Sequence, residues 1–341
     1  MRVAMYYNNR DIRVEEMDIP RIGPDEILVK IVASGVCGSD VLEWYRVPKA
    51  PIVLGHEIAG DIVQVGENVQ GWKEGDRVFV SHHVPCNMCR YCLADHHSVC
   101  DTLKSTNFDP GGFSEYVRVP AINVRHGVFG LPESMSYEDA VFVEPLACVY
   151  RGQHNAGWKP GRRVIVVGSG IAGLLHIQLA RIAGATRVVA VDISPKRLEV
   201  ARTFGADAAL PAGGDLPERL KESNDGRLAE LVIVCTGAMS ALNQAFHLVD
   251  RGGTILFFAP ADPNAKVEMP FNQVWWQEVM ITSSYAGSPR DIRAAIELIA
   301  SGRLKVADMI THRLPLARTS EGFTLVEEAR DSIKVVIEPQ K

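Results

Sequence analysis

The sequence predicts an α/β protein of two domains, one rich in β-strands and one built on a doubly wound parallel sheet. Three observations support this. The chain of 341 residues exceeds what one hydrophobic core usually organises. Residues 1–146 contain short alternating strands broken by glycine and proline, whereas residues 160–192 follow a strand, glycine turn, helix and strand pattern. A last strand closes the chain, so the parallel-sheet domain is inserted within the β-rich one.

The expected elements follow from local patterns. Alternating β-branched residues predict strands in the first region, and this pattern is typical of a barrel-like β domain. Continuous apolar runs later in the chain predict buried parallel strands. The expected strands lie at residues 26–36, 58–66, 75–80, 113–120, 231–237, 253–260, 279–287 and 332–339. Ser288 and Pro289 predict the start of a helix, with the serine as N-cap. We therefore expect one domain at 1–146 and 288–341 and the other at 147–287.

Composition excludes several classes of function. A net charge of −5 and a pI of about 6.1 do not favour binding to nucleic acid or to an anionic membrane. No run of eighteen apolar residues predicts a membrane span, and the first residues lack the features of a secretory signal. We expect a cytoplasmic protein that acts on a small molecule.

Four cysteines occur within fifteen residues, with two residues between each of the first three. Four thiolates so close in sequence can surround one tetrahedral ion, and zinc is the natural occupant. Disulfides are the alternative, but tight spacing without a secretion signal disfavours them. A site with four sulfur ligands has no open position, so this zinc is expected to be structural. Its expected ligands are Cys86, Cys89, Cys92 and Cys100, which we call the cysteine ladder.

A glycine-rich turn follows the first strand of the predicted parallel sheet. Gly168 permits the tight turn, Gly170 lets a pyrophosphate approach the backbone, and Gly173 lets helix and strand pack closely. Asp192 ends the next strand, nineteen residues after Gly173. A carboxylate there binds the ribose hydroxyls of NAD and repels the 2′-phosphate of NADP. NAD is therefore the expected cofactor, although Arg197 could moderate that preference.

A third group of residues completes the pattern: Cys37 before Ser39, the His56–Glu57 pair, and Glu144 before a proline. Together with the cysteine ladder, the glycine turn and the domain order, these residues resemble the zinc-dependent medium-chain alcohol dehydrogenase superfamily, and in particular its sorbitol and threonine dehydrogenase branch. The resemblance spans the whole chain. It implies a GroES-like catalytic domain, a Rossmann domain and a homo-oligomer, either dimer or tetramer.

The resemblance also implies roles for individual residues. Cys37 and His56 would bind a catalytic zinc, with Glu57 and Glu144 as ligands or one water away, so that each chain holds two zinc ions. A bound zinc lowers the pKa of a hydroxyl group, which favours hydride transfer to the nicotinamide. Ser39 would accept the hydroxyl proton, and Asp40 would orient the histidine ligand. The cofactor would lie against Gly168, Gly170, Ile171, Ala172, Gly173, Asp192, Arg197, Thr236, Ala259, Ser284 and Tyr285.

Two departures from the family pattern bear on the reaction. Leu42 stands where many relatives carry a histidine that continues the proton relay, so the path beyond Ser39 stays open. Polyol dehydrogenases place an arginine after the aromatic residue that matches Tyr285, and here Ala286 follows it. The expected substrate is a secondary alcohol such as a polyol or cyclitol. L-threonine 3-dehydrogenase is one alternative, and a non-catalytic NAD(H)-binding sensor stabilised by zinc is another.

Overall fold

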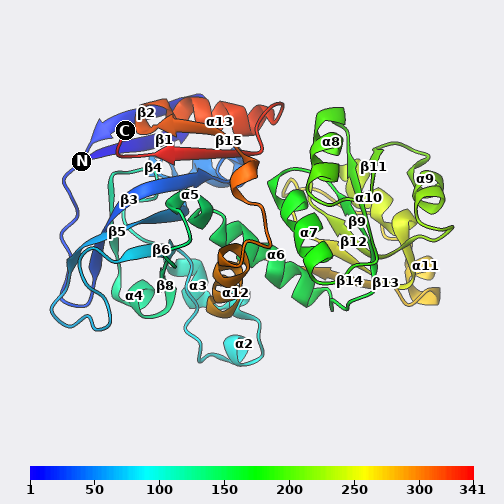
Figure 1. The fold of residues 1–341 in the computed structure, drawn as a ribbon, viewed down its shortest axis with the longest axis horizontal. Coiled ribbons are helices and arrows are strands. Elements are labelled where there is room, and N and C mark those ends of the chain that lie inside the picture. The colour runs from blue at the N-terminus through cyan, green and yellow to red at the C-terminus, as the bar shows by residue number, and fades with distance from the viewer. The chain divides into compact units, whose positions relative to one another are not determined.

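Two kinds of strand pattern produce two folding units in the computed structural model, which describes residues 1–341. One unit comprises Met1–Ala147 with Ala286–Lys341, and the other comprises Cys148–Tyr285 (Figure 1). Helix α6 (Val143–Asn155) begins in the first unit and ends in the second. The predicted fold class, a β-rich domain together with a doubly wound parallel sheet, is confirmed.

The first unit contains a seven-stranded sheet of order β15-β16-β3-β5-β6-β8, in which β7 also pairs with β3, and a three-stranded sheet of order β2-β1-β4. The long strands β3 and β5 pair antiparallel, and their inward side chains are buried. The strands are β1 (Arg2–Asn8), β2 (Asp11–Glu16), β3 (Ile27–Val36), β4 (Ile52–Val53), β5 (Glu57–Val65), β6 (Arg77–Ser81), β7 (Tyr116–Val119), β8 (Val128–Gly130), β15 (Ile310–Pro315) and β16 (Lys334–Glu338).

The first unit also contains short helices that the sequence patterns did not predict. Most are four to seven residues long, so they are too short to show a helical repeat of apolar residues. They are α1 (Glu43–Arg46), α2 (Arg90–Leu93), α3 (Asp101–Ser105), α4 (Ala121–Gly127) and α5 (Tyr137–Ala140), with 3₁₀ turns at Val47–Lys49, His97–Val99, Ala307–Met309 and Leu316–Arg318. Two longer helices, α12 (Pro289–Ala300) and α13 (Thr319–Glu328), complete the unit. The predicted start of α12 is confirmed, because Ser288 caps the backbone N–H of Asp291.

The second unit is a six-stranded parallel sheet of order β11-β10-β9-β12-β13-β14. Its strands are β9 (Arg163–Val167), β10 (Arg187–Asp192), β11 (Ala208–Pro211), β12 (Ala229–Val234), β13 (Val249–Phe257) and β14 (Met280–Ser283). Its helices are α7 (Ile171–Ile182), α8 (Pro195–Thr203), α9 (Leu216–Ser223), α10 (Met239–Leu248) and α11 (Phe271–Trp276). The order reverses at β9, as in a Rossmann fold.

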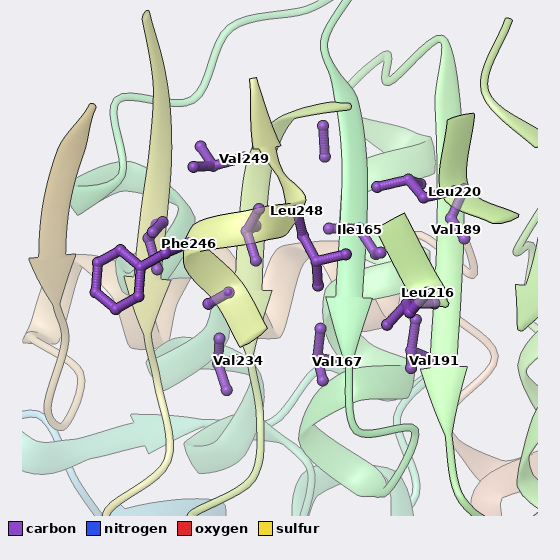
Figure 2. Packing of buried hydrophobic residues seen from close by; sticks show 14 of the residues in the cluster. Ile165, Val167, Val189, Val191, Leu216, Leu220, Val234, Phe246, Leu248 and Val249 are labelled. Atoms are coloured by element: carbon purple, nitrogen blue, oxygen red, sulfur yellow. The ribbon is translucent and has the colours of Figure 1, made fainter. Parts of the chain in front are cut away.

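Alternate residues of the central strands form the core of one face of this sheet. Figure 2 shows Ile165 and Val167 of β9 beside Val189 and Val191 of β10, with side chains from α9 and α10 packed on them. These four valine and isoleucine side chains are at most 4% exposed. β-branched residues suit such a doubly covered strand, which explains why the sequence showed continuous apolar runs here.

No helix of the described chain is both long enough and apolar enough to cross a membrane.

Candidate functional site

Four residues form a tight turn where β3 ends in the first unit. The backbone N–H of Asp40 donates to the carbonyl of Cys37 at 3.0 Å, and the Asp40 carboxylate accepts from the Cys37 N–H at 3.1 Å. The Ser39 hydroxyl lies 3.4 Å from the Cys37 sulfur. This turn therefore holds the thiol and the hydroxyl side by side.

The neighbouring strand β5 supplies the next two residues. Glu57 is the first residue of β5 and pairs with Gly35 of β3, while His56 immediately precedes the strand. A Cβ at Gly35 would overlap the carboxylate of Glu57 and the end of the Lys334 side chain, so a larger residue there would displace this buried pair. Strand pairing thus brings the end of β3 and the start of β5 together.

Cys37, His56 and Glu57 form a group that could hold a metal ion. Their ligand atoms all lie within 4.8 Å of one another. One thiolate, one imidazole and one carboxylate are suitable zinc ligands, and three protein ligands leave a position open for a substrate. Glu144, in the first turn of α6, is half-buried and lies outside this group. The donor set therefore fits a catalytic zinc without Glu144.

Asp40 fixes the orientation of the histidine. Its carboxylate is fully buried and lies 3.3 Å from Nδ1 of His56, which leaves Nε2 for a metal. Burial alone would lower the pKa of His56, but the charge and hydrogen bond of Asp40 outweigh it and hold that pKa well above its usual value. Burial likewise raises the pKa of Asp40, but His56 and Arg46 outweigh it, so the pKa is lowered. Because a metal requires the neutral imidazole, acid should weaken metal binding here.

Two basic residues that sequence patterns did not single out complete the surroundings. Lys334 of β16 is 1% exposed and forms an ion pair with Glu57, which is equally buried. Arg46 of α1 donates from Nη2 to the Ser39 hydroxyl at 3.2 Å and to the Asp40 carboxylate at 3.1 Å. The sequence did contain a signal for Lys334, because a lysine at the start of an otherwise apolar strand is unusual. Arg46 left none.

The four ladder cysteines are brought together by α2, a 3₁₀ turn and α3. Their sulfur atoms lie within 4.8 Å of one another. Burial raises the pKa of the Cys92 thiol to about 12. Backbone N–H groups of Cys86 and Leu103 overcome the same effect of burial at Cys100 and lower its pKa to about 6. A bound metal ion would remove this difference in protonation between the thiols, because every coordinated thiol is deprotonated outright. The cluster fits a structural zinc.

The glycine turn of the second unit lies between β9 and α7. Gly168 has a φ of +95°, a conformation that favours glycine. A Cβ at Gly173 would overlap the carbonyl oxygen of Gly168, so helix and turn can approach only if this residue is glycine. The buried carboxylate of Asp192 accepts from the backbone N–H of Ser169 at 2.8 Å and of Ser194 at 2.9 Å. Asp192 thus joins the turn to the end of β10.

The other residues expected at the cofactor all belong to this second unit. Thr236, Ala259 and Ser284 follow the carboxyl ends of β12, β13 and β14, which are neighbouring parallel strands. Tyr285 is 52% exposed beside Ser284. Nη1 of Arg197 would lie 3.7 Å from a Cβ at Gly170, so this guanidinium lies beside the turn. Ligands of doubly wound sheets bind outside the carboxyl ends of the strands, and these residues occupy that edge.

Comparison with known proteins agrees with both domains. Residues 23–133 match the family described as alcohol dehydrogenase GroES-like domain, and residues 172–301 match zinc-binding dehydrogenase. A sorbitol dehydrogenase of Mus musculus is 32% identical over 96% of this chain and 92% of its own length. An L-galactonate-5-dehydrogenase of Escherichia coli is 32% identical over 99% and 98%. A zinc-binding dehydrogenase from Sinorhizobium meliloti bound to NADP superposes with a TM-score of 0.89 at 29% identity, covering 99% of both chains.

Identity at this level over nearly the full length shows the family, and the relatives are named as dehydrogenases. The chain belongs to the zinc-dependent medium-chain alcohol dehydrogenase superfamily, in its sorbitol dehydrogenase-like branch, and is an oxidoreductase.

Proposed function

We propose that this enzyme oxidises a secondary alcohol of the polyol or cyclitol type to a ketone and transfers the hydride to NAD. The observation that supports this most directly is the group of Cys37, His56 and Glu57 beside the Ser39 hydroxyl. A zinc bound there would supply Lewis acidity that favours loss of the alcohol proton. The cysteine ladder would hold a second, structural zinc.

The roles of the side chains follow from their contacts. Asp40 holds the His56 ring in place through Nδ1. Ser39 would take the hydroxyl proton of the substrate, and Arg46 orients Ser39 by donating to both its hydroxyl and its carbonyl. Leu42 carries no group that could pass this proton on, so a bound cofactor would supply the next acceptor beyond Ser39 through its ribose hydroxyls. Glu144 lies in the first turn of α6, outside this group. It would approach the group only while a substrate or water molecule exchanges at the metal.

NAD(H) turnover across a substrate panel tests this function. We expect activity with secondary alcohols among polyols, cyclitols and L-threonine, and we expect a zinc chelator to abolish it. A preference for L-threonine would instead assign the threonine dehydrogenase activity that this branch also contains. If NADH binds tightly but no alcohol is oxidised, the proposal is wrong and a sensor role takes its place. Two zinc ions per chain are expected in the active sample.

The cofactor preference gives a second expected result. Replacing Asp192 by alanine should weaken NAD binding by roughly ten- to a hundredfold, because the carboxylate would bind both ribose hydroxyls through charge-assisted hydrogen bonds. NADP binding should change much less, since the same carboxylate repels its 2′-phosphate. Fluorescence titration with NADH and NADPH measures both. Asp192→Asn, which keeps an acceptor for the N–H of Ser169, is the matched control. Equal losses for both cofactors would show that Asp192 only organises the turn.

We also propose a homo-oligomer, dimer or tetramer, and a cytoplasmic location. Strand β14 lies at the edge of the parallel sheet, and Met280 on it is 59% exposed. Trp275 and Trp276 of the adjacent α11 are 61% and 74% exposed. Exposed apolar edges of this kind invite pairing with a second copy, which sedimentation would detect. None of the seven cysteines forms a disulfide, as suits a reducing compartment.

A further inference from the structure

Two cationic side chains, Arg46 and Lys49, lie close to the turn that carries Ser39. Arg46 lies one hydrogen bond from the Ser39 hydroxyl, and its guanidinium packs 4.6 Å from the centre of the Tyr45 ring. The Lys49 ammonium packs 3.8 Å from the centre of the same ring. Two cations therefore share one aromatic side chain next to the group that would hold the reacting hydroxyl.

Neighbouring side chains respond to these charges. Burial raises the pKa of the Tyr45 hydroxyl, but a hydrogen bond from Lys49 and the charges of Lys49 and Arg46 outweigh it, so the pKa lies below its usual value. Burial, together with the charges of His56, Arg46 and Lys49, lowers the pKa of His83 to about 4. His83 is thus neutral near pH 7 and does not add to the positive charge.

The acidic groups nearby are already paired. Asp40 lies between Arg46 and His56, and Glu57 is paired with Lys334. Glu43, on the same helix as Arg46, accepts instead from the backbone N–H of Asn9 at 3.1 Å. No carboxylate forms an ion pair with Lys49, and Nη1 of Arg46 has no protein acceptor. Arg46 and Lys49 therefore each keep N–H groups that can donate to a ligand.

We propose that the substrate is a secondary alcohol that carries a carboxylate, such as an aldonate, and that Arg46 and Lys49 bind that carboxylate while Ser39 holds the reacting hydroxyl. This substrate class rests on the proposed function. Nε and Nη2 of Arg46 already donate to Ser39 and Asp40, so Arg46 would bind the carboxylate through Nη1, and Lys49 adds an exposed point charge. Tyr45 keeps the two cations in place by packing against both of them.

The test compares aldonates with the alditols that differ only at the acid carbon: gluconate with sorbitol, galactonate with galactitol, and ribonate with ribitol. We expect the native enzyme to favour the acid in at least one pair, by a ratio of kcat/KM that falls as salt screens the charges. Lys49→Met should reduce that ratio by about ten- to a hundredfold, as expected for one charge-assisted contact. Lys49→Arg should retain most of it.

Lys73→Met is the matched control, because Lys73 is exposed in a distant turn of the same unit and should leave the ratio unchanged. If the alditols are preferred and Lys49→Met leaves the ratio as it was, the substrate class is wrong while the dehydrogenase function stands. If neither member of any pair, nor any other alcohol, gives chelator-sensitive turnover, the proposed function itself fails, and the substrate class falls with it.

Discussion

Replacing Cys37 by serine, or His56 by alanine, should reduce turnover by about a thousandfold or more. Each change removes a ligand from a group whose donor atoms lie within 4.8 Å of one another. A zinc ion supplies several kcal/mol of transition-state stabilisation, and about 4 kcal/mol corresponds to a thousandfold in rate. A serine hydroxyl, unlike a metal-bound thiol, stays protonated near pH 7 and does not replace the cysteine as a ligand.

The same variants should keep the fold and the dinucleotide site, because the residues expected to hold the cofactor belong to the other folding unit. NADH titration should therefore give a Kd within a few-fold of the native value, and zinc analysis should give one ion per chain instead of two. Cys235→Ala is the control, since that cysteine belongs to neither cluster and should leave two ions. If Cys37→Ser retained its turnover, Cys37 would not be a ligand of the catalytic metal. A count of zero would mean that the ladder holds no ion.

Much of the fold could be predicted because its signals are local. The strand–turn–helix pattern around Gly168 and the N-cap at Ser288 each depend on a few consecutive residues. Short helices such as α2 and α5 gave no periodic signal, and only the structure reveals them. Residues 279–287 were expected to form the last strand of the parallel sheet, and β14 is that edge strand, which pairs only with β13 and exposes Met280 and Ile281. The position of a strand in its sheet decides how far its side chains are buried, and local sequence does not encode that exposure.

The site was predictable where it reuses short motifs and not where it depends on strand pairing. Cys37, Ser39 and Asp40 lie within one turn, so their proximity followed from sequence. Lys334 reaches Glu57 because β16 and β5 both pair with β3, across 277 residues of chain. No local pattern encodes such a contact. Arg46 reaches Ser39 through a one-turn helix too short to predict.

The pair formed by Lys334 and Glu57 leads to the second large effect. Replacing Lys334 by methionine should destabilise the protein by about 3–5 kcal/mol, because it leaves a buried carboxylate without its counter-charge. Both side chains are 1% exposed, so water cannot replace the lost partner. For a unit of this size the midpoint of thermal unfolding should fall by roughly 10 °C. Arg318→Met is the control, since the pair of Arg318 and Glu321 is about half exposed and is worth about 1 kcal/mol or less.

A double variant separates the buried charge from the packing of the lysine chain. Lys334→Met with Glu57→Gln removes both charges, keeps similar volumes and should recover most of the lost stability. Zinc adds a further comparison, because a positive ion beside Glu57 also compensates its charge. Lys334→Met should therefore gain more stability from added zinc than the native enzyme does, provided that Glu57 faces the metal site. If the double variant is no more stable than Lys334→Met, the loss of stability comes from packing and not from the unpaired charge of Glu57.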